Sequence, residues 1–142
     1  MITKKYNEYI NENFGQADEA YGTFFVSILG LRDQAHIFHW QTESYARHQA
    51  LGAFYTTFLD LTDVLAEMLM GIKGRPTLGM AATISLVDYS EENVNDFIAK
   101  SYDLLNNKLE MICSSTENEE VFDQARMILA EVDKLKYLFT LS

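Results

Sequence analysis

Apolar residues recur along this chain with the three- and four-residue spacing of amphipathic α-helices over almost its whole length. The pattern predicts four helices, at about residues 18–42, 45–73 and 91–113 and from residue 117 onward. Two of the predicted starts carry an N-terminal signal. Ser90 is a good N-cap for the third helix, and Thr116 with Glu119 has the spacing of a capping box for the fourth. Local signals and periodicity therefore predict the same helix starts.

A long connection separates the second and third predicted helices. Residues 74–90 break the helical pattern with two glycines and the only proline of the chain, and a short helix is expected near residues 81–87. Short turns make antiparallel neighbours, whereas a long connection lets the second and third helices run parallel. The sequence therefore predicts an all-α, ferritin-like four-helix bundle with a long crossover. One domain, residues 1–142, is expected, with residues 1–15 as an N-terminal extension.

The composition of the chain indicates its cellular compartment and argues against membrane and DNA as partners. With 48% hydrophobic residues among 142, the chain is typical of a globular protein that buries a core. Its single Cys113 cannot form an internal disulfide, and the N-terminal stretch lacks the apolar run of a signal peptide, so a cytoplasmic protein is expected. No apolar run approaches the ~20 residues that a membrane span needs. The net charge of −10 and the lack of a lysine-rich tail predict that the chain does not bind DNA.

The candidate chemistry is concentrated in one region. All three histidines, His36, His39 and His48, lie within thirteen residues, and the second predicted helix then carries Asp60, Asp63 and Glu67. Asp63 and Glu67 are four residues apart and share a helix face, with Asp60 close to it. A solvated acidic stripe is one interpretation. The stripe is narrow and has apolar neighbours, which favours partial burial, and buried carboxylates need partners or metals.

The spacing of these residues decides how they can meet. His48 precedes Asp63 by fifteen residues, which is roughly 22 Å along a straight helix. Because metal–ligand bonds are only about 2 Å long, the two cannot share an ion within one chain. Two copies of the helix packed antiparallel about a two-fold axis near residues 56 and 57 bring them together, and the small residues around that point permit close approach. No glutamate has the Glu-x-x-His spacing of a di-iron bundle within one subunit.

The same residues resemble the signature of the Dps-type miniferritins. That signature is a His-Trp step, a second histidine fifteen residues before an aspartate, and a glutamate four residues later, here His39-Trp40, His48, Asp63 and Glu67. The resemblance implies that His39 and His48 of one subunit face Asp63 and Glu67 of its two-fold mate. It further implies a ferroxidase site that oxidises Fe(II) with peroxide or oxygen, in a homo-oligomeric cage of twelve subunits that stores Fe(III).

Other features extend or depart from this resemblance. His36 and Asp60 are additional candidate metal ligands, and a mixed nitrogen and oxygen ligand set also suits zinc. The chain carries Gly52 where the family often has an acidic residue, and the loop between His39 and His48 is about three residues shorter than usual. Small miniferritin-like proteins also occur in bacteriophages, and the chain resembles a phage-encoded protein of this kind. The alternatives are a non-enzymatic ferritin-like structural protein with at most a structural metal, and a helical interaction module.

Overall fold

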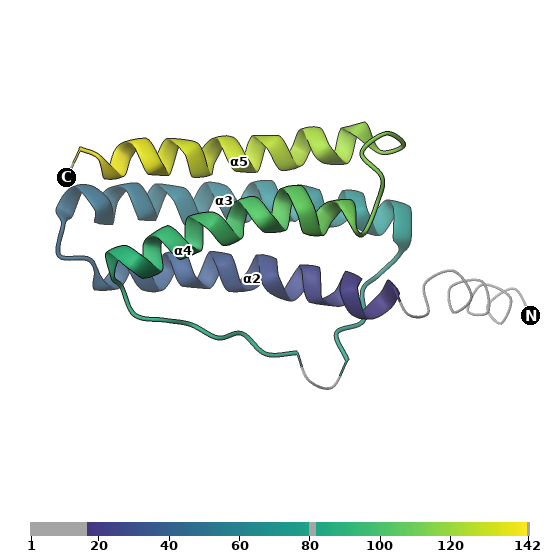
Figure 1. Cartoon of the computed structure of the whole chain (residues 1–142), viewed down its shortest axis with the longest axis horizontal. Coiled ribbons are helices and arrows are strands. Elements are labelled where there is room, and N and C mark those ends of the chain that lie inside the picture. Colours follow the sequence, from purple (N-terminus) through teal and green to yellow (C-terminus); the bar gives the residue numbers. More distant parts are fainter. Residues whose placement is uncertain (1–16, 80–81, 142) are drawn as a thin grey trace, which may run out of the picture.

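The computed structural model describes residues 17–79 and 82–141, which form helices joined by turns and one long connection. The helices are α2 (Ala17–Gln41), α3 (Tyr45–Lys73), α4 (Glu91–Tyr102), η1 (Asp103–Lys108) and α5 (Glu119–Phe139). They pack into an elongated bundle (Figure 1), which confirms the predicted all-α class and the helical bundle. The predicted extension, residues 1–15, lies outside the described ranges. None of the described helices has the length and apolarity to span a membrane.

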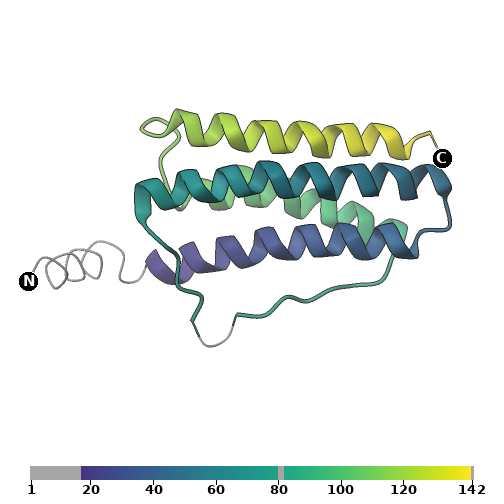
Figure 2. The same ribbon diagram turned by 180° about the vertical axis from the view of Figure 1, so that it is seen from behind.

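Helix α3 lies alongside both α2 and α5, while α4 packs against α2 and α5 (Figures 1 and 2). α2 and α3 are joined by a tight turn and run antiparallel, whereas α3 and α4 run in the same direction and are joined by the long crossover, residues 74–90. This is the course that the long connection predicted, because only a long link can return the chain to the starting end of the bundle.

The sequence located α3 correctly at both ends. Ser44 caps its N-terminus by accepting a hydrogen bond from the backbone N–H of Arg47 at 3.2 Å. Gly74 ends it with a φ of 84°, a backbone conformation that glycine adopts without steric cost. α2 also agrees with its predicted range to within one residue at each end.

The predicted short helix in the crossover is wrong, since residues 82–87 are not helical. Tertiary contacts hold this part of the chain against α2 instead. The side-chain amide of Gln34 donates to the carbonyl oxygen of Val87 and accepts from its backbone N–H, both at 2.8 Å. At the other end of the crossover, a Cβ on Gly22 would lie 2.1 Å from the carbonyl oxygen of Thr77. Glycine at position 22 therefore lets the crossover pass directly over α2.

Two predictions for the last two helices also need correction. Residues 103–108 form a π-helix, η1, where a continuous α-helix was expected, and the N–H of Leu109 bonds to the carbonyl of Leu104. The capping box is wrong as well. α5 begins at Glu119 with Asn118 in the N-cap position and no side-chain cap hydrogen bond, and the Thr116 hydroxyl pairs with that of Ser114. Ser90 does cap α4, as predicted, by accepting from the N–H of Asn93.

A hydrophobic core runs the length of the bundle. Its most deeply buried large side chains come from every long helix: Phe38, Leu51, Phe58, Leu65, Leu69, Leu105, Ile128 and Leu135. Full burial of a side chain of this size contributes about 1.5–3 kcal/mol. The core therefore holds α2 and α3 rigidly side by side, and these two helices carry all the candidate ligands.

Candidate metal centre

His39 and His48 are joined by two reciprocal hydrogen bonds across the turn between α2 and α3. Nδ1 of His39 lies 2.7 Å from the carbonyl oxygen of His48, and Nδ1 of His48 lies 2.8 Å from the carbonyl oxygen of His39. A carbonyl oxygen only accepts hydrogen bonds, so both Nδ1 atoms carry the hydrogen. In the neutral imidazole, Nε2 then keeps its lone pair. This is the tautomer of a metal-binding histidine whose other nitrogen donates to a carbonyl.

The same two rings are stacked, with centroids 3.9 Å apart and planes inclined by 15°. A metal–nitrogen bond lies near the plane of its imidazole ring and is about 2.0–2.1 Å long for zinc. An ion within that distance of both Nε2 atoms would stand far out of at least one ring plane, because the planes are nearly parallel and separated by a stacking distance. In this arrangement His39 and His48 are not placed to share one ion.

Gly52 makes room for this arrangement. A Cβ at position 52 would lie 3.0 Å from Cε1 and 3.3 Å from Nδ1 of His39. Those distances are tighter than ordinary contacts of a Cβ, so a side chain at this position would require the His39 ring to shift by a few tenths of an ångström. The absence of an acidic residue at position 52 is thus coupled to the close packing of His39 on α3.

His36 belongs to an aromatic cluster beside the histidine pair. Its ring stacks on Tyr55 at 4.2 Å with planes inclined by 22°, and Trp40 lies 4.2 Å away on the same α2 stripe. Tyr55 also meets the edge of the His39 ring, with centroids 5.4 Å apart. Tyr55 was not among the candidates drawn from the sequence. Its position seven residues after His48, on the same side of the helix, was the available signal.

The acidic residues stand apart from the histidines. Asp60, Asp63 and Glu67 are exposed, and none of them takes part in a hydrogen bond or ion pair within the described chain. The partial burial expected for the stripe is therefore not found in the single chain. Asp63 lines a groove of about 300 Å³ between α2 and α3, together with Phe25, Leu29, Arg32, Leu59 and Ala66. This groove is called the α2–α3 groove below.

Within one chain the candidate ligands do not converge. Among residues 17–79 and 82–141, no group of three or more His, Cys, Asp or Glu side chains is placed to hold a metal ion. His39 and His48 are brought together, His36 lies one turn away, and the three acidic residues occupy the other half of α3. The predicted site between two chains stays a prediction.

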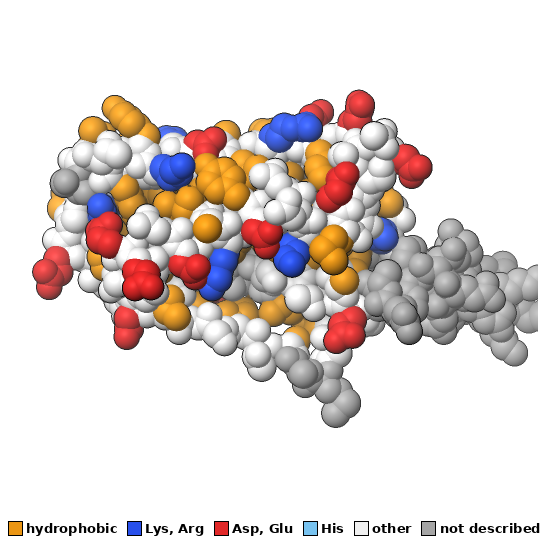
Figure 3. Space-filling view, viewed as in Figure 1, with side chains coloured by type: hydrophobic (Ala, Val, Ile, Leu, Met, Phe, Trp, Pro, Cys, Tyr) orange, Lys and Arg blue, Asp and Glu red, His pale blue; other side chains and the backbone are white. Residues whose placement is uncertain are grey.

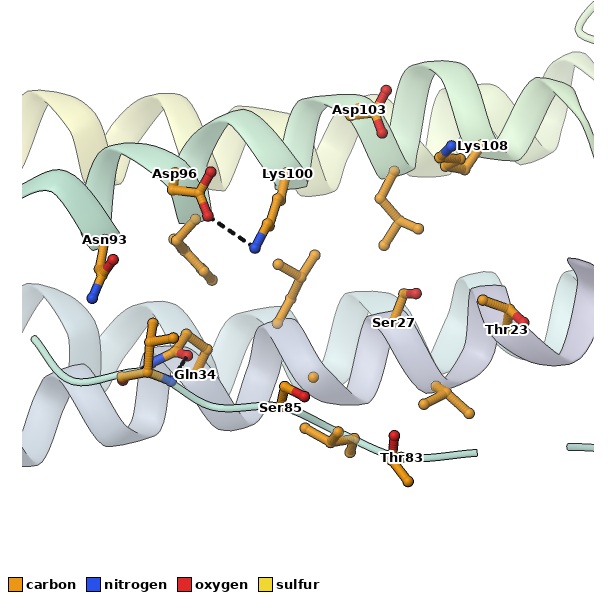
Figure 4. Close-up of a pocket in the computed structure, with 17 residues that line it drawn as sticks. Thr23, Ser27, Gln34, Thr83, Ser85, Asn93, Asp96, Lys100, Asp103 and Lys108 are labelled. Carbon is orange, nitrogen blue, oxygen red and sulfur yellow. Dashed lines mark hydrogen bonds and ion pairs between the residues drawn. The ribbon is translucent and has the colours of Figure 1, made fainter. Parts of the chain in front are cut away.

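A second cavity, of about 340 Å³, lies between α2, the crossover and α4 with η1. None of the candidate ligands lines it. In Figure 4, Lys100 extends from α4 into the space and pairs with Asp96 at 2.8 Å, opposite hydroxyl groups such as that of Ser27 on α2. On the face that carries α4 and α5, acidic and basic side chains are interspersed, and no histidine of the described ranges is visible at the surface (Figure 3). The histidine chemistry is confined to the α2–α3 side.

Comparison with known proteins places the chain in a family without assigning an activity. Residues 39–139 match DUF5856, a family of unknown function, and the chain belongs to this family. The matched region begins at His39 and includes every candidate ligand except His36. No curated protein and no solved structure matches the chain. Any functional assignment must therefore come from the chemistry of the residues.

Proposed function

We propose that this chain is a ferritin-like subunit that binds Fe(II) between two copies of α3 and oxidises it. His39 and His48 of one subunit, with Asp63 and Glu67 of its two-fold mate, form the site in this proposal. The subunits close into a cage of the Dps type, with Fe(III) stored inside. The observation that carries the proposal is the pair of Nδ1–carbonyl hydrogen bonds, which hold both imidazoles in the tautomer that leaves Nε2 for a metal ion.

The acidic half of α3 supplies the negative charge that neutral histidine ligands lack. Imidazole nitrogens bind Fe(II) well, and the carboxylates of Asp63 and Glu67 add the negative charge that stabilises Fe(III). Neither carboxylate is engaged within the described part of its own chain. Because Asp63 lies roughly 22 Å and Glu67 roughly 28 Å from His48 along the helix, a second chain in the antiparallel direction is the arrangement that brings the groups together.

The stacked imidazoles fit a site that holds two ions. One molecule of hydrogen peroxide accepts one electron from each of two Fe(II) ions and, with two protons, leaves as water. Since His39 and His48 are not placed to share one ion, each holds one reductant in this proposal, and Asp63 and Glu67 of the mate share the charge of the products. The site then delivers both electrons to one oxidant.

Complementation between defective chains tests the proposal. One variant carries His39→Asn and His48→Asn, because asparagine keeps a side-chain N–H donor where Nδ1 was and removes Nε2. The other carries Asp63→Asn and Glu67→Gln. Anaerobic Fe(II) titration followed by peroxide should show rapid oxidation, seen by absorbance, in the wild type and in neither variant. After joint refolding about half the dimers are mixed, each with one intact site, so roughly a quarter of the sites should work.

Each variant refolded alone is the control, and mass spectrometry of the mixture checks that the chains pair. Activity that does not return on mixing would mean that the ligands are not divided between chains. Light scattering that shows a monomer at micromolar concentration would remove both the cage and the site.

A non-enzymatic structural role is the second candidate. The reciprocal hydrogen bonds of His39 and His48 satisfy both Nδ1 atoms within one chain. They also join the end of α2 to the start of α3, so the pair stabilises the turn between these helices. This role predicts Fe(II) or Zn(II) binding in a fixed ratio with no rapid oxidation. The titration with peroxide therefore separates the two candidates directly.

A further inference from the structure

Trp40 is an exposed aromatic side chain at the end of α2, with 65% of its surface accessible. It is also the only tryptophan of the chain. Leu29, His36 and Trp40 follow one stripe of α2, at spacings of seven and four residues, so Trp40 faces the same side of the bundle as the α2–α3 groove. Figure 2 shows this side, with α2 and α3 in front of α4. One face therefore carries at one end an exposed indole that packs against His36 of its own chain, and an apolar recess towards the other end.

We infer that Trp40 of one copy fills the α2–α3 groove of a second copy packed against it face to face. The inference rests on the two-fold packing of the proposed function, but it does not depend on iron chemistry. The groove is filled by a side chain of an identical subunit. By two-fold symmetry, the contact between Trp40 and the groove occurs twice in each dimer.

The distribution of charge selects this occupant and its direction. The half of the face near the α2–α3 turn carries the histidines, and the other half carries Asp60, Asp63 and Glu67. Two faces stacked in the same direction would oppose one acidic cluster to the other. Stacked antiparallel, each acidic cluster meets the imidazoles of its partner, which removes the repulsion between like charges.

The position of the two-fold axis along α3 then places the indole of Trp40 opposite the groove of the partner. Trp40 follows His39, which is bonded to His48, so Trp40 stands beside the first turns of α3. A two-fold axis midway between His48 and Asp63 carries those turns onto the turns of the partner that hold Asp63. Leu59, Asp63 and Ala66 line the α2–α3 groove at that level. The exposed side chain and the recess are therefore equally far from the axis, on opposite sides of it.

The groove suits an indole in shape and chemistry. Its volume of about 300 Å³ is bounded mainly by apolar side chains, including Leu29 and Leu59, which are 40% and 43% exposed in the single chain, and also by Arg32. Asp63 at the margin offers a carboxylate oxygen as acceptor. A buried tryptophan needs a partner for its Nε1–H, and a carboxylate meets that need. Seating the indole also covers apolar surface that both copies otherwise expose.

Fluorescence tests the contact, because every photon of tryptophan emission comes from Trp40. In the wild-type oligomer the emission should have the shorter wavelength and weak acrylamide quenching of a shielded indole. Ala66→Glu, which places a charged side chain in the groove, should move the emission to longer wavelength and increase the quenching. Ala130→Glu, at an exposed position of α5, is the matched control and should change neither. Leu59→Lys repeats the test at a position that is 43% exposed in the single chain.

Mixing two chains shows whether the groove belongs to the partner. Ala66→Glu alone has an exposed indole facing an altered groove, and Trp40→Phe has an intact groove and no tryptophan signal. Refolded together, about half of the tryptophans should enter mixed dimers and regain shielding. If mixing leaves the emission unchanged, the inference is wrong.

Other outcomes separate this inference from the proposed function. Solvent-like emission from a wild-type protein that light scattering shows to be oligomeric overturns the contact and leaves the iron site standing. Shielded emission with restoration on mixing, but no iron oxidation, supports the contact and removes the proposed activity. A wild-type monomer removes both.

Discussion

The two halves of α3 carry the candidate ligands in opposite ways. In the first half, His48 and its α2 neighbour His39 are held by two hydrogen bonds, a ring stack and a glycine that leaves space for one of the rings. In the second half, Asp60, Asp63 and Glu67 point from an exposed surface and have no partner in the described chain. One half is organised before any ligand or second subunit arrives, and the other is not.

Because of this difference, the histidine half of α3 should contribute to the stability of the subunit, and the acidic half should not. Groups bonded within the chain contribute to folding, so their loss is felt whether or not a metal binds. Exposed carboxylates four residues apart on a helix repel one another and contribute nothing favourable to the isolated subunit. Any specific role for them requires a group from outside the described part of the chain. Variants in the two halves should therefore fail differently.

The largest effect is expected in the acidic half. Under the proposed function, Asp63→Asn with Glu67→Gln should reduce the rate of Fe(II) oxidation by at least about 100-fold. Loss of a hydrogen bond to a metal ligand alone typically costs about 10–100-fold, and loss of two ligands should cost more. The free energy of unfolding should stay the same or rise by about 0.2–0.5 kcal/mol, since a repulsive pair is neutralised. Peroxide-initiated oxidation kinetics and urea unfolding measure the two quantities. A marked loss of stability would contradict the contrast between the halves.

The next effect concerns the histidine half. His39→Ala should lower the free energy of unfolding by about 1–3 kcal/mol, because the carbonyl oxygen of His48 loses its donor. His39→Asn should recover part of this loss, since its amide can donate to the same carbonyl. The midpoint of urea unfolding measures both. Equal stability of the two variants would show that the Nδ1 hydrogen bond does not contribute, and that only the packing of the ring matters.

A smaller effect comes from a matched pair of glycines on α3. A Cβ at position 71 would meet no neighbouring atom within 4 Å, so Gly71→Ala should stabilise the helix by up to about 1 kcal/mol. Gly52→Ala should show a smaller gain or a loss, because its Cβ requires the His39 ring to shift by a few tenths of an ångström. Urea unfolding of the two variants measures the difference.

Adding His39→Ala to Gly52→Ala provides the control. With the ring removed, the substitution at position 52 should become stabilising, like that at position 71. The difference between the two backgrounds is the coupling energy of the two positions. Equal gains for Gly52→Ala and Gly71→Ala in the wild-type background would mean that the His39 ring moves aside at little cost.

The smallest effect is expected at Cys113, which lies near the C-terminal end of α3. Burial raises the pKa of its thiol, so less thiolate is present at neutral pH and alkylation should be slower than for an exposed cysteine. His39→Ala should leave this rate nearly unchanged, because the change lies at the other end of α3. Iodoacetamide labelling followed by mass spectrometry measures it. A marked acceleration in His39→Ala would show that the two ends of α3 open together.

The sequence alone determined most of the architecture. Apolar periodicity located α2 and α3, Ser90 marked the start of α4, and the long break after α3 predicted its parallel course with α4. These features depend on neighbours along the chain, which the sequence shows directly. The spacing of His48 and Asp63 likewise excluded a shared ion within one chain, because helix rise per residue is nearly constant.

Only the tertiary structure decided the details of the candidate site. The stack of His39 on His48 depends on how α2 and α3 meet across their turn, and the role of Gly52 depends on which atoms fill its side-chain space. The non-helical crossover is held at Val87 by the side-chain amide of Gln34, fifty-three residues away. Such contacts join positions distant in the sequence. No local pattern encodes them, because the free energy that fixes them arises only when the packed helices bring the groups together.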